Sequence, residues 1–419
     1  MTEMKSPGKD WRIILTLLVS TLGILYFLVQ TFALGIFWLT SFFDATMAID
    51  QSITIGLFLW TSILGGILLI PLVVISISRL RGAGPPRWLD TKQSQLYKRL
   101  PWMALTWLLI VALGWLVASN QTLAVLLLGP INVLVAGLPV LLIFFVARRG
   151  LFGGSPLRQW LIFGFSITLL PLIVILAEII SILLLGGAAT IWMMIRIMSD
   201  PFLEREITFI FNQVMIYGEN VEGLIRFLEP IILQPGVIYW AVAIFGGIFP
   251  IIEEALKPLA LWGLAGRKIT QQEGFVGGML CGAGFALMEN IFYFTNVLLA
   301  EDWLFMAVGR AGTGVLHILA SGLVGWGLAK AWQQGKWLSL VWLTLGAFLL
   351  HGIWNVIALV SGIAPFLTLG TEPSLPQLLL YHTPLLVLVL ISILGLVLIN
   401  RHLRSLSENH EALVVDHSI

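Results

Sequence analysis

The chain has 419 residues, of which 58% are apolar and 11% are charged, and its formal net charge is +1. Ordinary soluble domains have about a quarter of their residues charged, so a soluble fold could not hide this much apolar surface. The balanced charge argues against nucleic-acid binding, which needs a basic patch. The single cysteine, Cys281, excludes an intrachain disulfide and thiolate-rich metal sites, and packing is its expected role. Composition therefore indicates a protein surrounded by membrane lipid.

Repeated apolar segments are long enough to cross a bilayer, whose hydrocarbon core, about 30 Å thick, needs about 20 residues of helix. They predict an all-α fold, a polytopic transmembrane helix bundle of about ten spans in the cell membrane. No cleavable secretory signal is evident, because the first segment is too long and lacks a small-residue cleavage site. The predicted spans are 13–40, 52–78, 102–119, 122–147, 160–186, 236–263, 274–299, 305–330, 337–363 and 379–399.

The distribution of Lys and Arg predicts the direction of each span, since basic residues favour cytoplasmic loops. They are concentrated in the N-terminal segment and in alternate loops, which places both termini in the cytoplasm. Tryptophans near predicted span ends, such as Trp102, Trp303 and Trp337, are expected to anchor the helices at the membrane interface. The basic loops are 79–99, 148–158, 267–268, 330–336 and 401–404.

A long connector with several carboxylates, residues 187–235, divides the chain. Asp200 and Pro201 are typical of a helix start, and helical spacing of apolar residues after them predicts an amphipathic helix on the outer membrane surface. The predicted organisation is therefore a five-helix membrane region, an external connector, a catalytic membrane core and a polar cytoplasmic tail expected to be disordered. These parts cover 1–186, 187–235, 236–399 and 400–419.

Ionisable residues at membrane depth cost several kcal/mol unless they are paired or hydrated, so each is a candidate for function. The first five spans hold one acidic residue at this depth, Glu178, which could equally contact another helix or line a cavity. Arg310 is expected to pair with a carboxylate or to reach the outer interface, with no catalytic role. The remaining candidates all follow the connector: Glu253, Glu254, Lys257, Glu289, Asn290, His317, His351 and Asn355.

Helical spacing indicates how some of these residues are arranged. Lys257 follows Glu253 by four residues and Glu254 by three, so on a continuous helix it can face either carboxylate. Pro250 and Pro258 bracket this group and are expected to bend the helix. With a rise of about 1.5 Å per residue, four spans bring their polar groups to a similar mid-membrane layer. Two pairs share a helix face, His351 with Asn355 and Phe285 with Glu289.

Peptide hydrolysis is one reaction that uses carboxylates and imidazoles away from bulk water. A carboxylate there can take a proton from an attacking water. A histidine can move protons or bind a metal that activates the water, and an amide such as Asn355 can donate to the oxyanion that forms. Two adjacent carboxylates point about 100° apart on a helix, so Glu253 and Glu254 should have unequal roles. We expect Glu254 to be the base.

Four motifs on four successive spans resemble those of the PrsW family of intramembrane proteases, which is related to the type 2 CAAX prenyl proteases. The resemblance covers about residues 236–363. It implies catalytic roles for Glu253, Glu254, Glu289, His317, His351 and Asn355, and a membrane-anchored protein substrate, for example a single-pass regulator such as an anti-sigma factor. At the position of Glu289 the relatives usually have His. The motifs are Glu253-Glu254-x-x-Lys257, Phe285-x-x-x-Glu289-Asn290, His317 on a Gly-rich helix, and His351-Gly352-x-Trp354-Asn355.

Two mechanisms stay open at this point. Glu289, His317 and His351 form a His₂Glu set, a known catalytic Zn²⁺ combination with an open fourth position. A metal-free protease would instead activate water with Glu254 and a histidine. Other functions are also open. The same intramembrane groups would suit a proton-coupled transporter, and Glu253 and Glu254 with Lys257 could form a structural ion pair. The two halves of the sequence show no matching pair of interrupted helices, and this weighs against the transporter.

Overall fold

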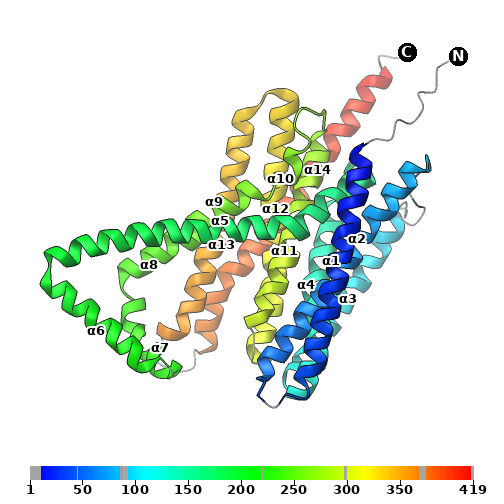
Figure 1. The fold of residues 1–419 in the computed structure, drawn as a ribbon. Coiled ribbons are helices and arrows are strands. Elements are labelled where there is room, and N and C mark those ends of the chain that lie inside the picture. The colour runs from blue at the N-terminus through cyan, green and yellow to red at the C-terminus, as the bar shows by residue number, and fades with distance from the viewer. Residues whose placement is uncertain are drawn as a thin grey trace. The chain divides into compact units, whose positions relative to one another are not determined.

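The computed structural model describes residues 11–44, 46–84, 86, 93–218, 220–296, 300–367 and 374–416, and no strand occurs in these residues (Figure 1). The basic residues Lys5, Lys9, Arg87 and Lys92, used to predict orientation, lie outside them. The elements are α1 (Trp11–Ser41), α2 (Ile49–Leu80), α3 (Gln93–Ala118), α4 (Gln121–Ala147), α5 (Pro156–Ser199), α6 (Pro201–Tyr217), α7 (Val221–Ile232), α8 (Pro235–Ala241), the π-helix η2 (Val242–Ile248), α9 (Phe249–Leu256), α10 (Leu259–Trp262), α11 (Gln271–Tyr293), the 3₁₀ turn η3 (Phe294–Asn296), α12 (Ala300–Gln334), α13 (Trp337–Leu367) and α14 (Leu375–Asp416).

The prediction of about ten spans is confirmed: ten helical stretches in the described part of the chain are long and apolar enough to cross a membrane. The direction in which each span crosses stays a prediction. The chain divides into two compact units, and α5, α13 and α14 each run from one unit into the other. The first unit contains residues 1–171, 257–347 and 387–419, and the second contains residues 172–256 and 348–386.

Within the first unit, α11 and α12 lie side by side, and α11 is buried along most of its length (Figure 1). Their close approach requires glycine, because an added Cβ on α11 would meet the backbone of α12. A Cβ at Gly274 would lie 2.5 Å from the Gly325 oxygen, one at Gly278 2.9 Å from the Ser321 carbonyl carbon, and one at Gly282 2.7 Å from the His317 carbonyl carbon. This seam holds the His317 backbone against α11.

Two expectations about the first unit are wrong. Trp303 is not an interfacial anchor, because its side chain is buried and its Nε1 donates to Asn132 Oδ1 over 2.7 Å. The tail from Asn400 is not disordered, because α14 continues to Asp416. Asn400 Nδ2 donates to the Ala147 and Arg149 carbonyls, at 2.8 Å and 2.9 Å. Asn400 therefore ties α14 to the C-terminal end of α4, where the last carbonyls of a helix have no partner within that helix.

The second unit begins in the C-terminal part of α5, which continues well past the predicted end of the fifth span at 186 and stops at Ser199. The predicted helix start is confirmed: Asp200 accepts from the amides of Phe202 and Leu203, and Pro201 is the first residue of α6. Asn220 caps α7 in the same way by accepting from the Gly223 amide. Where α6 and α7 lie relative to a membrane surface stays a prediction.

The sixth predicted span runs as one helical stretch through α8, the π-helix η2 and α9, and it is interrupted at residues 257–258, before α10. Pro250 lies in the first turn of α9, and Pro258 precedes α10. Because α9 ends at Leu256, Lys257 lies outside this helix, and the expected continuous face with Glu253 and Glu254 is wrong. The two carboxylates therefore lie in the last turns of the continuous stretch formed by α8, η2 and α9, just before it ends at Leu256.

Candidate active site

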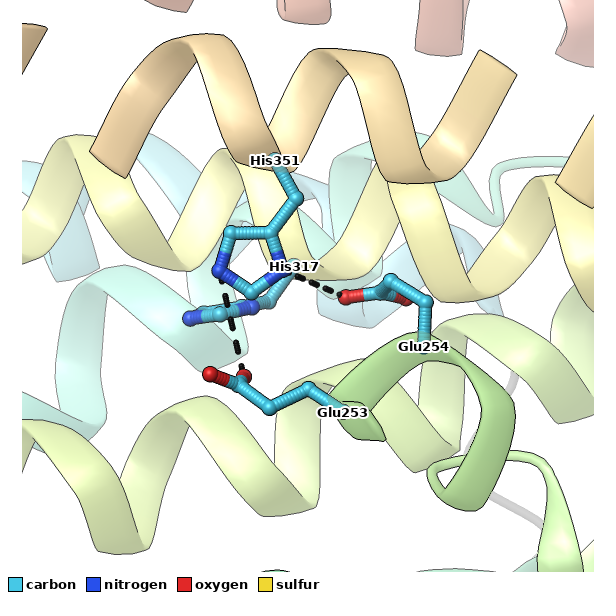
Figure 2. Close-up of side chains that lie close together, drawn as sticks. All are labelled: Glu253, Glu254, His317 and His351. Atoms are coloured by element: carbon cyan, nitrogen blue, oxygen red, sulfur yellow. Dashed lines mark hydrogen bonds and ion pairs between the residues drawn. The ribbon is translucent and has the colours of Figure 1, made fainter. Parts of the chain in front are cut away.

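Two of the predicted carboxylates and one histidine come together in the second unit. Glu253 and Glu254 are buried on α9, and His351 is buried on α13. His351 Nδ1 is 3.0 Å from Glu254 Oε1, a hydrogen-bond distance, whereas His351 Nε2 is 3.8 Å from Glu253 Oε2. Figure 2 shows the imidazole with one ring nitrogen directed to each carboxylate. Three groups that bind or transfer protons thus share one dry environment.

The two carboxylates contact His351 differently, which agrees with the expectation of unequal roles. An ionised Glu254 accepts the proton of Nδ1, and the lone pair of Nε2 then points toward the Glu253 carboxylate. Two acceptors that face each other across 3.8 Å attract a cation or the hydrogens of a water molecule. A carboxylate that holds one nitrogen of a histidine is also the usual way to fix the tautomer of a metal-binding imidazole.

A second group of predicted residues comes together in the first unit, where His317 of α12 contacts charged side chains through both ring nitrogens. Its Nδ1 is 2.7 Å from Lys257 Nζ, and its Nε2 is 2.7 Å from Glu289 Oε2. His317 and Lys257 have no solvent-exposed surface. An ammonium can only donate, so Nδ1 accepts from Lys257 and Nε2–H donates to Glu289. This arrangement fixes the tautomer of a neutral His317.

Arg310 completes the charges of this group. Its Nη2 is 2.6 Å from Glu289 Oε2, its Nε donates to Asn290 Oδ1 over 2.7 Å, and its guanidinium lies 4.2 Å from the centre of the Tyr293 ring. The expectation that Arg310 pairs with a carboxylate is therefore confirmed. A buried ion pair costs desolvation, which good geometry and added hydrogen bonds offset. Arg310 and Asn290 hold Glu289 beside His317.

Phe285 forms one wall of the same group, on the face of α11 that it shares with Glu289. Lys257 Nζ lies 4.4 Å from the centre of its ring, and the His317 ring meets it edge-on at 5.5 Å between centroids. A cation over an aromatic face is stabilised by the ring quadrupole, more so where water is excluded. The motif residue Phe285 therefore stabilises the Lys257 ammonium next to His317.

Asn355 contacts the protein backbone. Its Nδ2 donates over 2.9 Å to the carbonyl of Phe245, which belongs to η2 of the same unit. Sequence reasoning expected this amide at the oxyanion, because it is one turn after His351. It could not detect the contact with η2, since Phe245 is more than a hundred residues away along the chain.

Among the described residues, four buried side chains carry the kinds of donor atoms that hold a metal ion: Glu253, Glu254 and His351 of the second unit and His317 of the first. Two carboxylates and two imidazoles are ligands typical of zinc. Glu289, predicted as a ligand from sequence, is not in this set, and its carboxylate oxygen instead contacts Arg310 and His317. Sequence spacing could not distinguish the two sets, because both place their groups at mid-membrane depth.

Comparison with known proteins gives one match. Residues 206–393 match the family model described as PrsW family intramembrane metalloprotease. The match begins in α6 and ends in α14, and it includes every motif residue described above. No curated protein and no solved structure matches the chain. The chain is thus a multi-pass membrane protein in which residues 206–393 match a family of intramembrane peptidases.

Proposed function

We propose, on the premise that residues 206–393 are a PrsW-family domain, that this protein hydrolyses a peptide bond in or near the membrane span of a membrane-anchored protein. A single-pass regulator such as an anti-sigma factor is the kind of substrate that the family resemblance implies. The observation that carries the proposal is the buried His351 between two carboxylates of one short helix. A purely structural ion pair would need one such carboxylate, and its partner would be a fixed cation.

Glu253 is the base in this proposal. Its Oε2 lies 3.8 Å from Nε2 of His351, the ring nitrogen that does not face Glu254. Glu253 takes a proton from the attacking water, whose oxygen bonds to the scissile carbonyl carbon, and delivers that proton to the nitrogen that leaves when the C–N bond breaks. This assignment departs from the expectation that Glu254 is the base, because we assign Glu254 to holding His351 and the metal ion.

His317, His351 and Glu254 would hold the metal ion, a His₂Glu set. The ion, when bound, acidifies its water and stabilises the negative charge of the tetrahedral oxygen. The four donors fit because all are buried carboxylates and imidazoles. Both nitrogens of His317 have partners, Lys257 at Nδ1 and Glu289 at Nε2, so a metal ion bound to His317 would have to replace one of these contacts. Lys257 follows Glu254 by only three residues, so it is close in sequence to Glu253 and Glu254.

The deciding experiment compares Glu253→Gln with Glu254→Gln in protein reconstituted into liposomes with a single-span reporter substrate. Glu253→Gln should lower kcat on the order of 10²–10⁴-fold while bound zinc is retained. Glu254→Gln should weaken zinc binding by about 10–100-fold, because it loses a ligand that also orients His351. Zinc content by elemental analysis and cleavage by gel mobility are measured on the same samples.

Glu178→Gln is the matched control, since it also neutralises a carboxylate at membrane depth and lies in α5, which carries none of the motif residues. It should cleave at the wild-type rate. Equal and mild effects of the two substitutions on α9 would contradict the proposal and indicate a structural ion pair. Cleavage that persists in wild-type protein shown to be metal-free would exclude the metal and leave Glu253 acting on water directly.

A further inference from the structure

The backbone of η2 has a hydrogen-bonding gap that Pro250 creates. In this π-helix the Phe249 amide donates to the Ile244 carbonyl, five residues back. The next bond of the same pattern would join the Phe245 carbonyl to the amide of residue 250. Proline has no N–H, so this bond cannot form. A buried carbonyl without a partner costs free energy comparable to a lost hydrogen bond, and more in lipid than beside water.

Asn355 donates to this same carbonyl from the neighbouring helix α13. Its approach depends on small residues at the contact. A Cβ added at Gly352 would collide with the Gly246 carbonyl oxygen, and one added at Gly246 would collide with the Val356 side chain. The backbone of α13 therefore lies directly against η2. The amide of Asn355 supplies the hydrogen that residue 250 cannot.

We infer that Asn355 is a positioning residue, which fixes the turn ahead of Glu253 and Glu254 by supplying the hydrogen bond that Pro250 removes. This inference rests on the proposed function for its activity readout. The two carboxylates follow Pro250 by three and four residues, in the helix that continues directly from η2 into α9. His351, one turn before Asn355, contacts the carboxylates themselves. One face of α13 thus holds α9 at its leading backbone and at its acidic side chains.

Restoring the N–H of residue 250 distinguishes the positioning role of Asn355 from a role at the oxyanion, because only a positioning role can be replaced by that N–H. Pro250→Ala gives residue 250 an amide that can reach the Phe245 carbonyl, so it should compensate for Asn355→Ala. Asn355→Ala alone should lower kcat by about 10²-fold, the usual cost of about 1 Å of misplacement at a reacting group. The KM should change less than twofold, because the substrate contacts no altered group. The double variant Asn355→Ala/Pro250→Ala should recover at least tenfold of the lost kcat.

Asn355→Ala combined with Pro384→Ala is the matched control. Pro384 also lies inside a helix, α14, but is outside η2, so its replacement should give no recovery. Hydrogen exchange of residues 243–256 gives a readout that does not depend on cleavage. Asn355→Ala should speed exchange there at least tenfold, and adding Pro250→Ala should reverse this.

The outcomes separate the inference from the proposed function. No recovery by Pro250→Ala, together with unchanged exchange in Asn355→Ala, overturns the positioning role and assigns Asn355 to the oxyanion. If the wild type cleaves no substrate, the proposed function fails, and the exchange experiment still decides for or against the positioning role.

Discussion

Replacing Gly282 with alanine tests whether the tight seam between α11 and α12 positions His317. The built Cβ would lie 2.7 Å from the His317 carbonyl carbon, whereas ordinary contact begins at 3.4 Å. The two helices must therefore separate by at least about 3.4 − 2.7 = 0.7 Å at this level, and by more because the His317 carbonyl oxygen lies nearer still. The obstacle is backbone, so no side-chain rotation can relieve it. Overpacking of this kind typically costs about 1–3 kcal/mol.

The same displacement moves the backbone that carries the His317 imidazole, which contacts Lys257 and Glu289 at 2.7 Å each. A shift close to 1 Å at a reacting group lowers activity by about 10²-fold. We expect Gly282→Ala to melt at a lower temperature in detergent and to lose cleavage of the reporter substrate by about that factor. Thermal unfolding and liposome cleavage are measured on the same preparation.

Gly309→Ala is the matched control, because Gly309 also lies in a helix, α12, but a Cβ there meets nothing within 4 Å. Alanine is favoured over glycine in a helix interior, so this variant should be as stable as wild type or slightly more so. The reasoning about the seam would be refuted if Gly282→Ala matched Gly309→Ala in both melting temperature and cleavage.

Three further predictions concern the buried ion pair, the end of α14 and the topology. Arg310→Met should cost about 3–5 kcal/mol by leaving Glu289 buried without its cation, and Glu289→Gln in the same protein should restore part of the loss; denaturant or thermal unfolding of the single and double variants measures this. Asn400→Leu should leave the carbonyls of Ala147 and Arg149 without their donor, which should lower the melting temperature and the free energy of unfolding by about 1–3 kcal/mol. A stop codon after Leu406 keeps Asn400 and should leave the melting temperature unchanged. A cysteine placed at Asn220 should react with an impermeant thiol reagent outside the cell and one at Ser94 should not; the reverse labelling would overturn the predicted orientation.

Local features of the chain were enough to predict the helices. Apolar segments of about 20 residues can only be stable in lipid as helices, so the number of spans follows from composition along the chain. The start of α6 was equally predictable, because an N-cap aspartate and a following proline act on their own helix. The interruption of the sixth span at residues 257–258 follows from Pro258, which removes a backbone donor whatever surrounds it. Candidate site residues were found because lipid makes every buried ionisable group costly.

The partner of each polar side chain depended on tertiary packing. Which side chains meet is determined by the rotation and spacing of helices that are far apart in sequence, and periodicity on one helix carries no information about either. Glu289 contacts Arg310 and His317 across the seam with α12, and Asn355 contacts the backbone of η2. Glu253 and Glu254 are adjacent and chemically alike, and only the direction of the His351 ring distinguishes them. The apolar content of this chain specifies a membrane protein, whereas its chemistry depends on contacts that form only when the helices have packed.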